Sequence, residues 1–82
     1  MTAYVANQLS ETVTPIQTAA NTAGKAIRVG DFPDYIAITP NGRTVYVANF
    51  LSSTVTRIRT ATDKRLRHVQ VGGGPDYIAM TP

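Results

Sequence analysis

The chain has no cysteine and only one histidine, His68, among its 82 residues. It therefore has no disulfide and no thiolate metal site, and a single imidazole holds no metal ion without several carboxylates. No apolar run approaches the length of a membrane span, and Met1 leads into strand-like sequence without a charged leader and apolar core. We accordingly expect no metal, no cofactor, no membrane partner and no signal peptide.

Charged residues are also scarce, at 16%, whereas 43% of the residues are hydrophobic. This balance is typical of a folded chain rather than a disordered one. A chain this short buries only about 60% of its unfolded surface, so domains of this size usually need a staple, a metal or a partner subunit.

What the sequence does contain is an internal repeat. Shifting the chain by 42 positions aligns residues 2–40 with residues 44–82, and 22 of the 39 aligned pairs are identical. Residues 41–43 link the two units through an Asn-Gly turn, which is a strong hairpin signal. A strand-rich repeat near this length is typical of a propeller blade or another stacked array. Two units are too few to bury a propeller core by themselves.

Each unit is expected to form four short strands, because turn signals recur every 8 to 12 residues and five prolines interrupt any helical window. The expected strands are 2–7, 12–18, 26–29 and 34–39 in the first unit, and 44–49, 54–60, 67–71 and 76–81 in the second. The strands that begin at Asp34 and Asp76 are apolar on both faces, which is typical of a strand covered on both sides. This pattern predicts an all-β fold with these two strands innermost.

The repeated motifs resemble those of the YVTN β-propeller repeat family. They read YVAN, then S-x-T-V-T-x-I-x-T-A, then V-G-x-x-P-D-Y-I-A-x-T-P, and they cover nearly the whole chain twice. Ala6 and Ala48 replace the usual Thr of the first motif, and Tyr35 and Tyr77 stand where the family often has Gly, which would narrow the channel. The resemblance implies radially arranged four-stranded blades and a secreted or cell-surface parent protein, but it implies no particular activity.

The position of the strands in the chain predicts how it associates. If the strands of each blade are numbered outward from the channel, the chain contains strands 2-3-4-1-2-3-4-1 in sequence order. The first blade therefore lacks its innermost strand, and the last strand of the chain is an innermost strand with no blade of its own. We expect residues 76–81 of one protomer to pair with residues 2–7 of the next, which removes two exposed sheet edges. The residues expected in this pairing are Tyr4, Val5, Ala6, Tyr77, Ile78 and Ala79.

Such head-to-tail pairing predicts a closed homo-oligomeric ring in which strands are exchanged between protomers. Two four-stranded blades per chain give six blades in a trimer or eight in a tetramer, and the residues do not decide between them. A symmetric ring of seven blades is excluded. Association is expected to be obligate, because an unpaired apolar strand is costly for a small domain.

Six side chains are candidates for ligand contact at the mouth of the channel. They are Asp34, Asp76, Tyr35, Tyr77, Asn7 and Asn49. A ring of carboxylates from Asp34 and Asp76 would suit a cation, although an aspartate at such a position more often caps its own turn. For the asparagines, turn capping is favoured over ligand contact, and for the tyrosines, packing between blades is favoured over stacking on a ligand.

The second unit also carries a basic cluster. Arg57 and Arg59 alternate on one strand, and Arg67 lies on the adjoining strand, so three guanidinium groups gather near the rim. An anionic partner is one interpretation, but a solvated edge that blocks aggregation is favoured. The scarcity of interleaved aromatic residues argues against a nucleic acid.

No catalytic constellation is recognisable, since no serine stands in a nucleophile turn with a histidine and a carboxylate. We therefore expect a non-enzymatic structural or binding scaffold that assembles with itself. The alternatives are a fragment of an enzymatic, lactonase-like propeller, by fold analogy alone, and a module whose basic rim binds an anionic partner.

Overall fold

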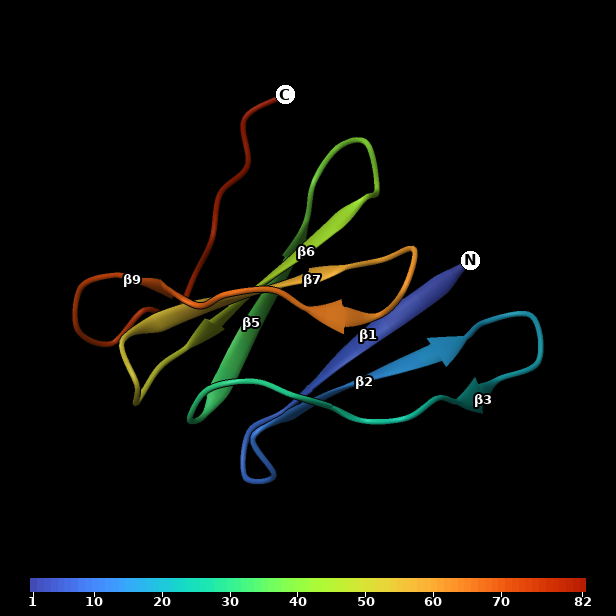
Figure 1. Cartoon of the computed structure of the whole chain (residues 1–82), viewed down its shortest axis with the longest axis horizontal. Coiled ribbons are helices and arrows are strands. Elements are labelled where there is room, and N and C mark those ends of the chain that lie inside the picture. The colour runs from blue at the N-terminus through green and yellow to red at the C-terminus, as the bar shows by residue number, and fades with distance from the viewer.

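The computed structural model describes residues 1–82 as nine β-strands in two antiparallel sheets that lie side by side (Figure 1). The first sheet contains β1 (Thr2–Asn7), β2 (Thr12–Gln17), β3 (Thr22–Ala23) and β4 (Ile27–Arg28). The second contains β5 (Pro33–Ile38), β6 (Thr44–Asn49), β7 (Thr54–Arg59), β8 (Lys64–Arg65) and β9 (Val69–Gln70). The all-β prediction is confirmed, and no helix capable of crossing a membrane occurs.

The second sheet is a whole blade in the predicted order. It runs β5-β6-β7-β8, and β9 also pairs with β7. The outermost strand is therefore broken into two short pieces, so the expected strand over 67–71 is reduced to β9. The other piece, β8, lies between the expected strands, where no strand was predicted. The three inner strands have nearly the predicted bounds.

The first sheet lacks an innermost strand, as its place in the chain predicts. β1 pairs only with β2, and the short β3 and β4 pair with the other side of β2. The prediction of an all-β chain with two blade-like sheets is therefore confirmed, whereas the completion of the first blade by a strand of another copy stays a prediction. One sheet has its innermost position empty, and the other has its outermost strand divided.

The strand predicted over 76–81 does not form within the chain. Residues 71–82 contain no strand; Tyr77 lies against Tyr35 of β5, and the last residues project beyond the sheets (Figure 1). A strand exists only through hydrogen bonds to a neighbour, and the sheet that this segment would complete is not beside it. The segment therefore forms no strand here, although its residues favour one.

The core lies between the two blades. Val13, Val29, Val45, Val47 and Ile58 are each at most 5% exposed and form one cluster. Side chains alternate between the faces of a strand, so one face of β2 and one face each of β6 and β7 supply four of these residues, and Val29 comes from the segment that follows β4. The two opposite faces of the blades are not covered by another sheet.

The turns of the two units have the same backbone geometry. Glu11 and Ser53 are equivalent in the repeat, and their φ angles are 60° and 56°. Asn21 and Asp63 form a second equivalent pair, with φ angles of 53° and 55°. These are left-handed conformations, which Asn and Asp tolerate better than most residues. The repeat in sequence is thus a repeat in structure.

We expect Ile58→Ala to lower the free energy of unfolding by about 2–5 kcal/mol, because Ile58 is fully buried between the blades and its truncation leaves a cavity. Leu9→Ala is the matched control, since Leu9 is 91% exposed and its loss should change stability by less than about 0.5 kcal/mol. Urea unfolding followed by circular dichroism measures both. Equal effects would contradict the assigned core.

Candidate functional site

The same pair of side-chain hydrogen bonds, which we call the Asn–Thr bracket, spans the β1–β2 loop of the first blade and the β6–β7 loop of the second. Asn7 Nδ2 donates to Thr12 Oγ1 at 3.1 Å and to Thr14 Oγ1 at 2.8 Å. In the second blade, Asn49 Nδ2 donates to Thr54 Oγ1 at 3.1 Å and Thr56 Oγ1 at 2.9 Å. The amide nitrogens of both asparagines are therefore occupied by hairpin contacts.

The bracket of the second blade extends to the histidine. Thr56 Oγ1, which accepts from Asn49 Nδ2, also lies within hydrogen-bond distance of His68 Nδ1, at 2.8 Å. The first unit has Ala26 at the place of His68 and lacks this extension. Asn49 is fully buried, and its Oδ1 atom has no hydrogen-bond partner.

The two predicted mouth aspartates lie close enough to influence each other. Burial raises the pKa of the Asp34 carboxyl, and the negative charge of Asp76 raises it further, against the opposing effect of a backbone hydrogen bond. Asp34 Oδ1 is buried and has no hydrogen-bond partner. No group of three or more His, Cys, Asp or Glu side chains is placed to hold a metal ion.

The mouth tyrosines also come together. The rings of Tyr35 and Tyr77 are 4.4 Å apart at their centroids and inclined by 37°. The pKa of Tyr35 is raised, first by a hydrogen bond with Tyr77 and then by burial. Tyr77 remains 69% exposed. The C-terminal segment thus runs beside β5, with its Asp-Tyr pair next to the equivalent pair of β5.

The predicted strand-pairing residues are far from sharing a sheet within one chain. Tyr4, Val5 and Ala6 pair on one side with Pro15, Thr14 and Val13 of β2, and they have no neighbour on the other side. Tyr77, Ile78 and Ala79 belong to the unpaired C-terminal segment. Both edges are therefore available for pairing.

The three arginines of the basic cluster lie on the uncovered side of the second blade. Arg57 and Arg59 alternate with the buried Thr56 and Ile58 along β7, so they face away from the first blade. Arg57 Nε donates to the main-chain oxygen of Arg67 at 3.3 Å. None of the three guanidinium groups has an acidic partner. The ion pair of the structure joins two other residues, Arg28 and Glu11, at 3.6 Å.

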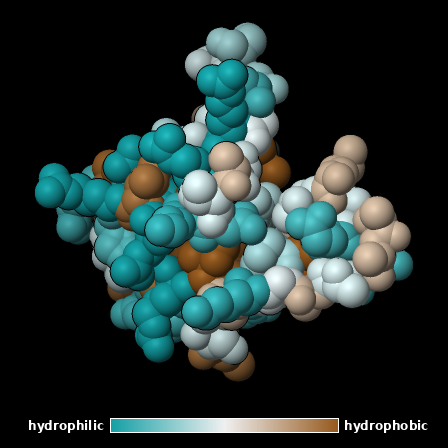
Figure 2. All heavy atoms as spheres, turned by 45° about the vertical axis from the view of Figure 1, so that its right-hand side comes forward, coloured by the Kyte–Doolittle hydropathy of each residue, from teal (hydrophilic) through white to brown (hydrophobic).

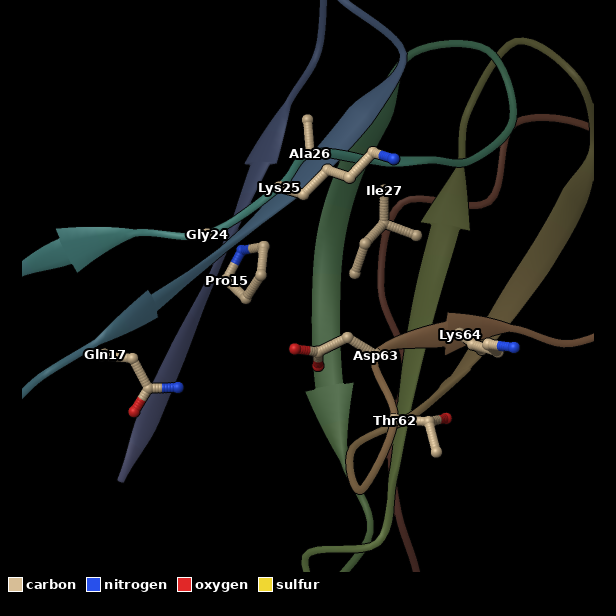
Figure 3. Close-up of a pocket in the computed structure, with 9 residues that line it drawn as sticks. All are labelled: Pro15, Gln17, Gly24, Lys25, Ala26, Ile27, Thr62, Asp63 and Lys64. Atoms are coloured by element: carbon tan, nitrogen blue, oxygen red, sulfur yellow. The ribbon is translucent and has the colours of Figure 1, made fainter.

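A cleft of about 420 Å³ opens between the two blades (Figure 3). We call it the interblade cleft, and its lining residues are Pro15, Gln17, Gly24, Lys25, Ala26, Ile27, Thr62, Asp63 and Lys64. It lies toward the outer strands rather than at the predicted channel mouth. Sequence reasoning missed it, because it forms where β2 and residues 24–27 of the first unit meet residues 62–64 of the second.

A hydrogen bond joins the blades beside this cleft. Tyr4 Oη donates to Asp63 Oδ1 at 2.8 Å, from β1 of the first blade to the turn before β8 of the second. Burial, then this hydrogen bond, then the charge of Asp63 raise the pKa of Tyr4 from 10.0 to about 12. Sequence reasoning missed this contact, because no local pattern links Tyr4 to a turn 59 residues further along the chain.

Twisted antiparallel sheets arranged side by side, with the apolar strand innermost, define the class of this protein as a β-propeller. The model of the YNCE-like beta-propeller family matches residues 1–82, and the chain belongs to this family. The predicted resemblance to β-propeller repeats is thereby confirmed. No curated protein matches the chain significantly.

Two solved structures contain a similar pair of blades. A chain of Kuenenia stuttgartiensis hydrazine synthase superposes with a TM-score of 0.87 and 25% identity, covering 92% of this chain and 21% of that chain. Apo AztD from Citrobacter koseri superposes with a TM-score of 0.72 and 19% identity, over 92% of this chain and 22% of that one. The chain spans about a fifth of the length of either.

The expectation that the chain is non-enzymatic is wrong, because the reasoning behind it does not hold. It rested on the lack of a catalytic constellation, yet a closely similar pair of blades occurs in a chain of hydrazine synthase, which is an enzyme. The physical reason is that two blades fill only 21% of that chain. The residues of one fifth of such a chain say nothing of the chemistry in the remainder.

We expect Tyr4→Phe to lower the free energy of unfolding by about 1 kcal/mol at pH 8, where the Tyr4–Asp63 hydrogen bond is intact. The pKa of Tyr4 is raised in the folded chain, so its contribution is complete below pH 10.0 and is lost as the pH rises toward about 12. Thermal unfolding at pH 8, 10 and 11.5 measures the difference.

The wild-type chain should therefore lose more stability than Tyr4→Phe between pH 10 and pH 11.5. Asp63→Asn is the control, because asparagine tolerates the left-handed turn and keeps an oxygen acceptor, but it removes the neighbouring charge. It should keep most of the stability at pH 8 and show a weaker pH dependence. Parallel pH curves for the wild type and Tyr4→Phe would refute the assigned role of this bond.

Proposed function

We propose that this chain supplies two blades of a β-propeller that closes by head-to-tail association of copies of the chain. Each blade has one face that packs against the other blade and one face that is uncovered. By the repeat, the uncovered face of the first blade is equivalent to the packed face of the second, and the uncovered face of the second is equivalent to the packed face of the first. This equivalence is the observation that carries the proposal. The partner of each uncovered face is therefore specified by the chain itself.

The uncovered face of the first blade shows this most clearly. Val5 is 41% exposed, whereas its equivalent Val47 is fully buried against the neighbouring blade. Thr14 and Ile16 are half-buried, whereas their equivalents Thr56 and Ile58 are fully buried. A further blade on this face would cover apolar surface in the same way. Hydrophobic side chains do reach the surface among hydrophilic ones in Figure 2.

A pair of glycines supports the same arrangement. A Cβ atom at Gly30 would lie 2.6 Å from Ser52 Oγ and 2.8 Å from Asn49 Cγ, because the second blade closes tightly on this loop. The equivalent Gly72 has nothing within 4 Å of such an atom. In the proposed ring, Gly72 meets Asn7 and Ser10 of the next copy, which are equivalent to Asn49 and Ser52.

Strand exchange completes the first sheet in this proposal. The residues Tyr35, Ile36 and Ala37 of β5 pair with Ala48, Val47 and Tyr46 of β6. Applied one repeat further, this register pairs Tyr77, Ile78 and Ala79 with Ala6, Val5 and Tyr4 of the next copy. The C-terminal segment then becomes the innermost strand that the first sheet lacks, and both free edges are removed.

Two blades per protomer give a trimer of six blades or a tetramer of eight. The Tyr4–Asp63 hydrogen bond between blades has an equivalent in either ring, from Tyr46 of one copy to Asn21 of the next. Each apolar side chain that the ring covers contributes at most about 1.5–3 kcal/mol. Within the ring, Asp34, Asp76, Tyr35 and Tyr77 would face a small ligand at the channel mouth.

An enzymatic whole protein is a second candidate. The likeness to a chain of hydrazine synthase, with a TM-score of 0.87, supports it. In that case the blades described here are part of the frame that positions a reaction centre.

Light scattering over a hundredfold range of concentration tests the assembly. We expect a mass of three or four protomers. Gly72→Ala should weaken each contact by about 1–3 kcal/mol, because its methyl group overpacks the interface with the next copy. Gly73→Ala is the matched control, because the equivalent position in the first unit is Asp31, which carries a Cβ atom without strain. A folded wild-type monomer, or variants that assemble equally well, would refute the proposal.

A further inference from the structure

The basic cluster of the second blade occupies the positions that line the interblade cleft in the first blade. Pro15, Gln17 and Lys25 line the cleft within the chain, and their repeat equivalents are Arg57, Arg59 and Arg67. The sequence therefore does not scatter these arginines over the rim. It concentrates them where a second cleft would form against a further blade.

The other wall of that second cleft comes from the next copy of the chain. Thr62, Asp63 and Lys64 line the cleft within the chain, and their equivalents in the first unit are Ala20, Asn21 and Thr22. Because Asn21 replaces Asp63, the second cleft has no carboxylate. Three guanidinium groups thus face a wall without negative charge.

The local structure leaves these guanidinium groups free to bind. The bond from Arg57 Nε to the main-chain oxygen of Arg67 holds the two residues next to each other. Arg57 is half-buried and Arg59 and Arg67 are exposed, and none has an acidic partner in the chain. His68 bonds to Thr56 on the opposite face of the blade, so it does not belong to this group.

We infer that the cleft between protomers binds a small polyvalent oxyanion, such as a compound that carries phosphate or carboxylate groups. This inference rests on the proposed head-to-tail ring. Closing the ring brings three cations into a partly dehydrated cleft, and like charges in such a place are costly without a counterion. Guanidinium groups also match oxyanions through paired hydrogen bonds.

The size of the cleft fits a small ligand. The cleft within the chain has a volume of about 420 Å³. The repeat gives the second cleft the same backbone frame, with Leu66 and His68 at the places of Gly24 and Ala26, so the second cleft is the narrower of the two. Pockets for small molecules typically measure about 300–1,000 Å³. The cleft within the chain has Pro15, Gln17 and Lys25 in place of the three arginines and also contains the carboxylate of Asp63, so it should bind anions less well.

Isothermal titration calorimetry with inorganic pyrophosphate tests the inference, and light scattering on the same samples reports the assembly. We expect one pyrophosphate per protomer. The variant with Arg57→Gln and Arg67→Gln should lose at least about tenfold in affinity while it still assembles. The matched control carries Lys25→Gln and Lys64→Gln, which remove the same charge from the cleft within the chain, and it should bind within about twofold of the wild type.

The outcomes separate the two proposals. A ring that binds no pyrophosphate, or that binds it equally weakly in both variants, overturns the oxyanion site and leaves the ring standing. A monomeric wild type overturns both. Tight binding of a single-stranded DNA oligomer in place of pyrophosphate, with the same loss in the arginine variant, would show an acidic polymer as the ligand and overturn the small-molecule site.

Discussion

The structure depends on the need of a blade to be covered on both faces. A twisted sheet with apolar residues on both sides is stable only between two neighbours, and this chain gives each of its two sheets one neighbour. Val13, Val45, Val47 and Ile58 are buried because the two blades face each other. Val5 is partly exposed because nothing covers the outer face of its blade. The same physical need therefore explains both the core and its incompleteness.

Hydrogen bonding imposes a parallel constraint at the sheet edges. The first sheet has no innermost strand, and the C-terminal segment has the composition of an innermost strand but no sheet to join. The segment nevertheless lies beside β5, where Tyr77 contacts Tyr35. An innermost strand of a further blade would occupy that same place. Packing has thus positioned the segment, and only its hydrogen-bonding partner is missing.

Much of the fold could be predicted from the sequence, because the repeat shows which residues must have equivalent environments. The bounds of β1 and β6 follow from runs of β-branched and aromatic residues, and the order of the strands follows from the apolar pattern at Asp34. The division of the outer strand into β8 and β9 could not be predicted. It depends on how Leu66 and its neighbours meet β7, where the Leu66 amide bonds to the Arg57 carbonyl.

The candidate site was less predictable. The role of the asparagines, tyrosines and aspartates as ligand contacts stays a prediction. The asparagines bond to threonines of their own hairpins, whereas the partners of the tyrosines depend on residues far along the chain. The Tyr4–Asp63 bond joins residues 59 positions apart, and no local pattern reveals such a distance. The relation of the basic cluster to the interblade cleft depends on the three-dimensional lining of that cleft, which the sequence alone does not give.

Disulfide trapping between strands tests the account most directly, because the natural chain has no cysteine. A chain with Ala6→Cys and Tyr77→Cys places the two thiols opposite each other only across two copies, in the register that β5 and β6 adopt. Mild oxidation followed by denaturing electrophoresis without reductant should give covalent trimers or tetramers. Monomers with free thiols, or with a bridge inside one chain, would contradict the account.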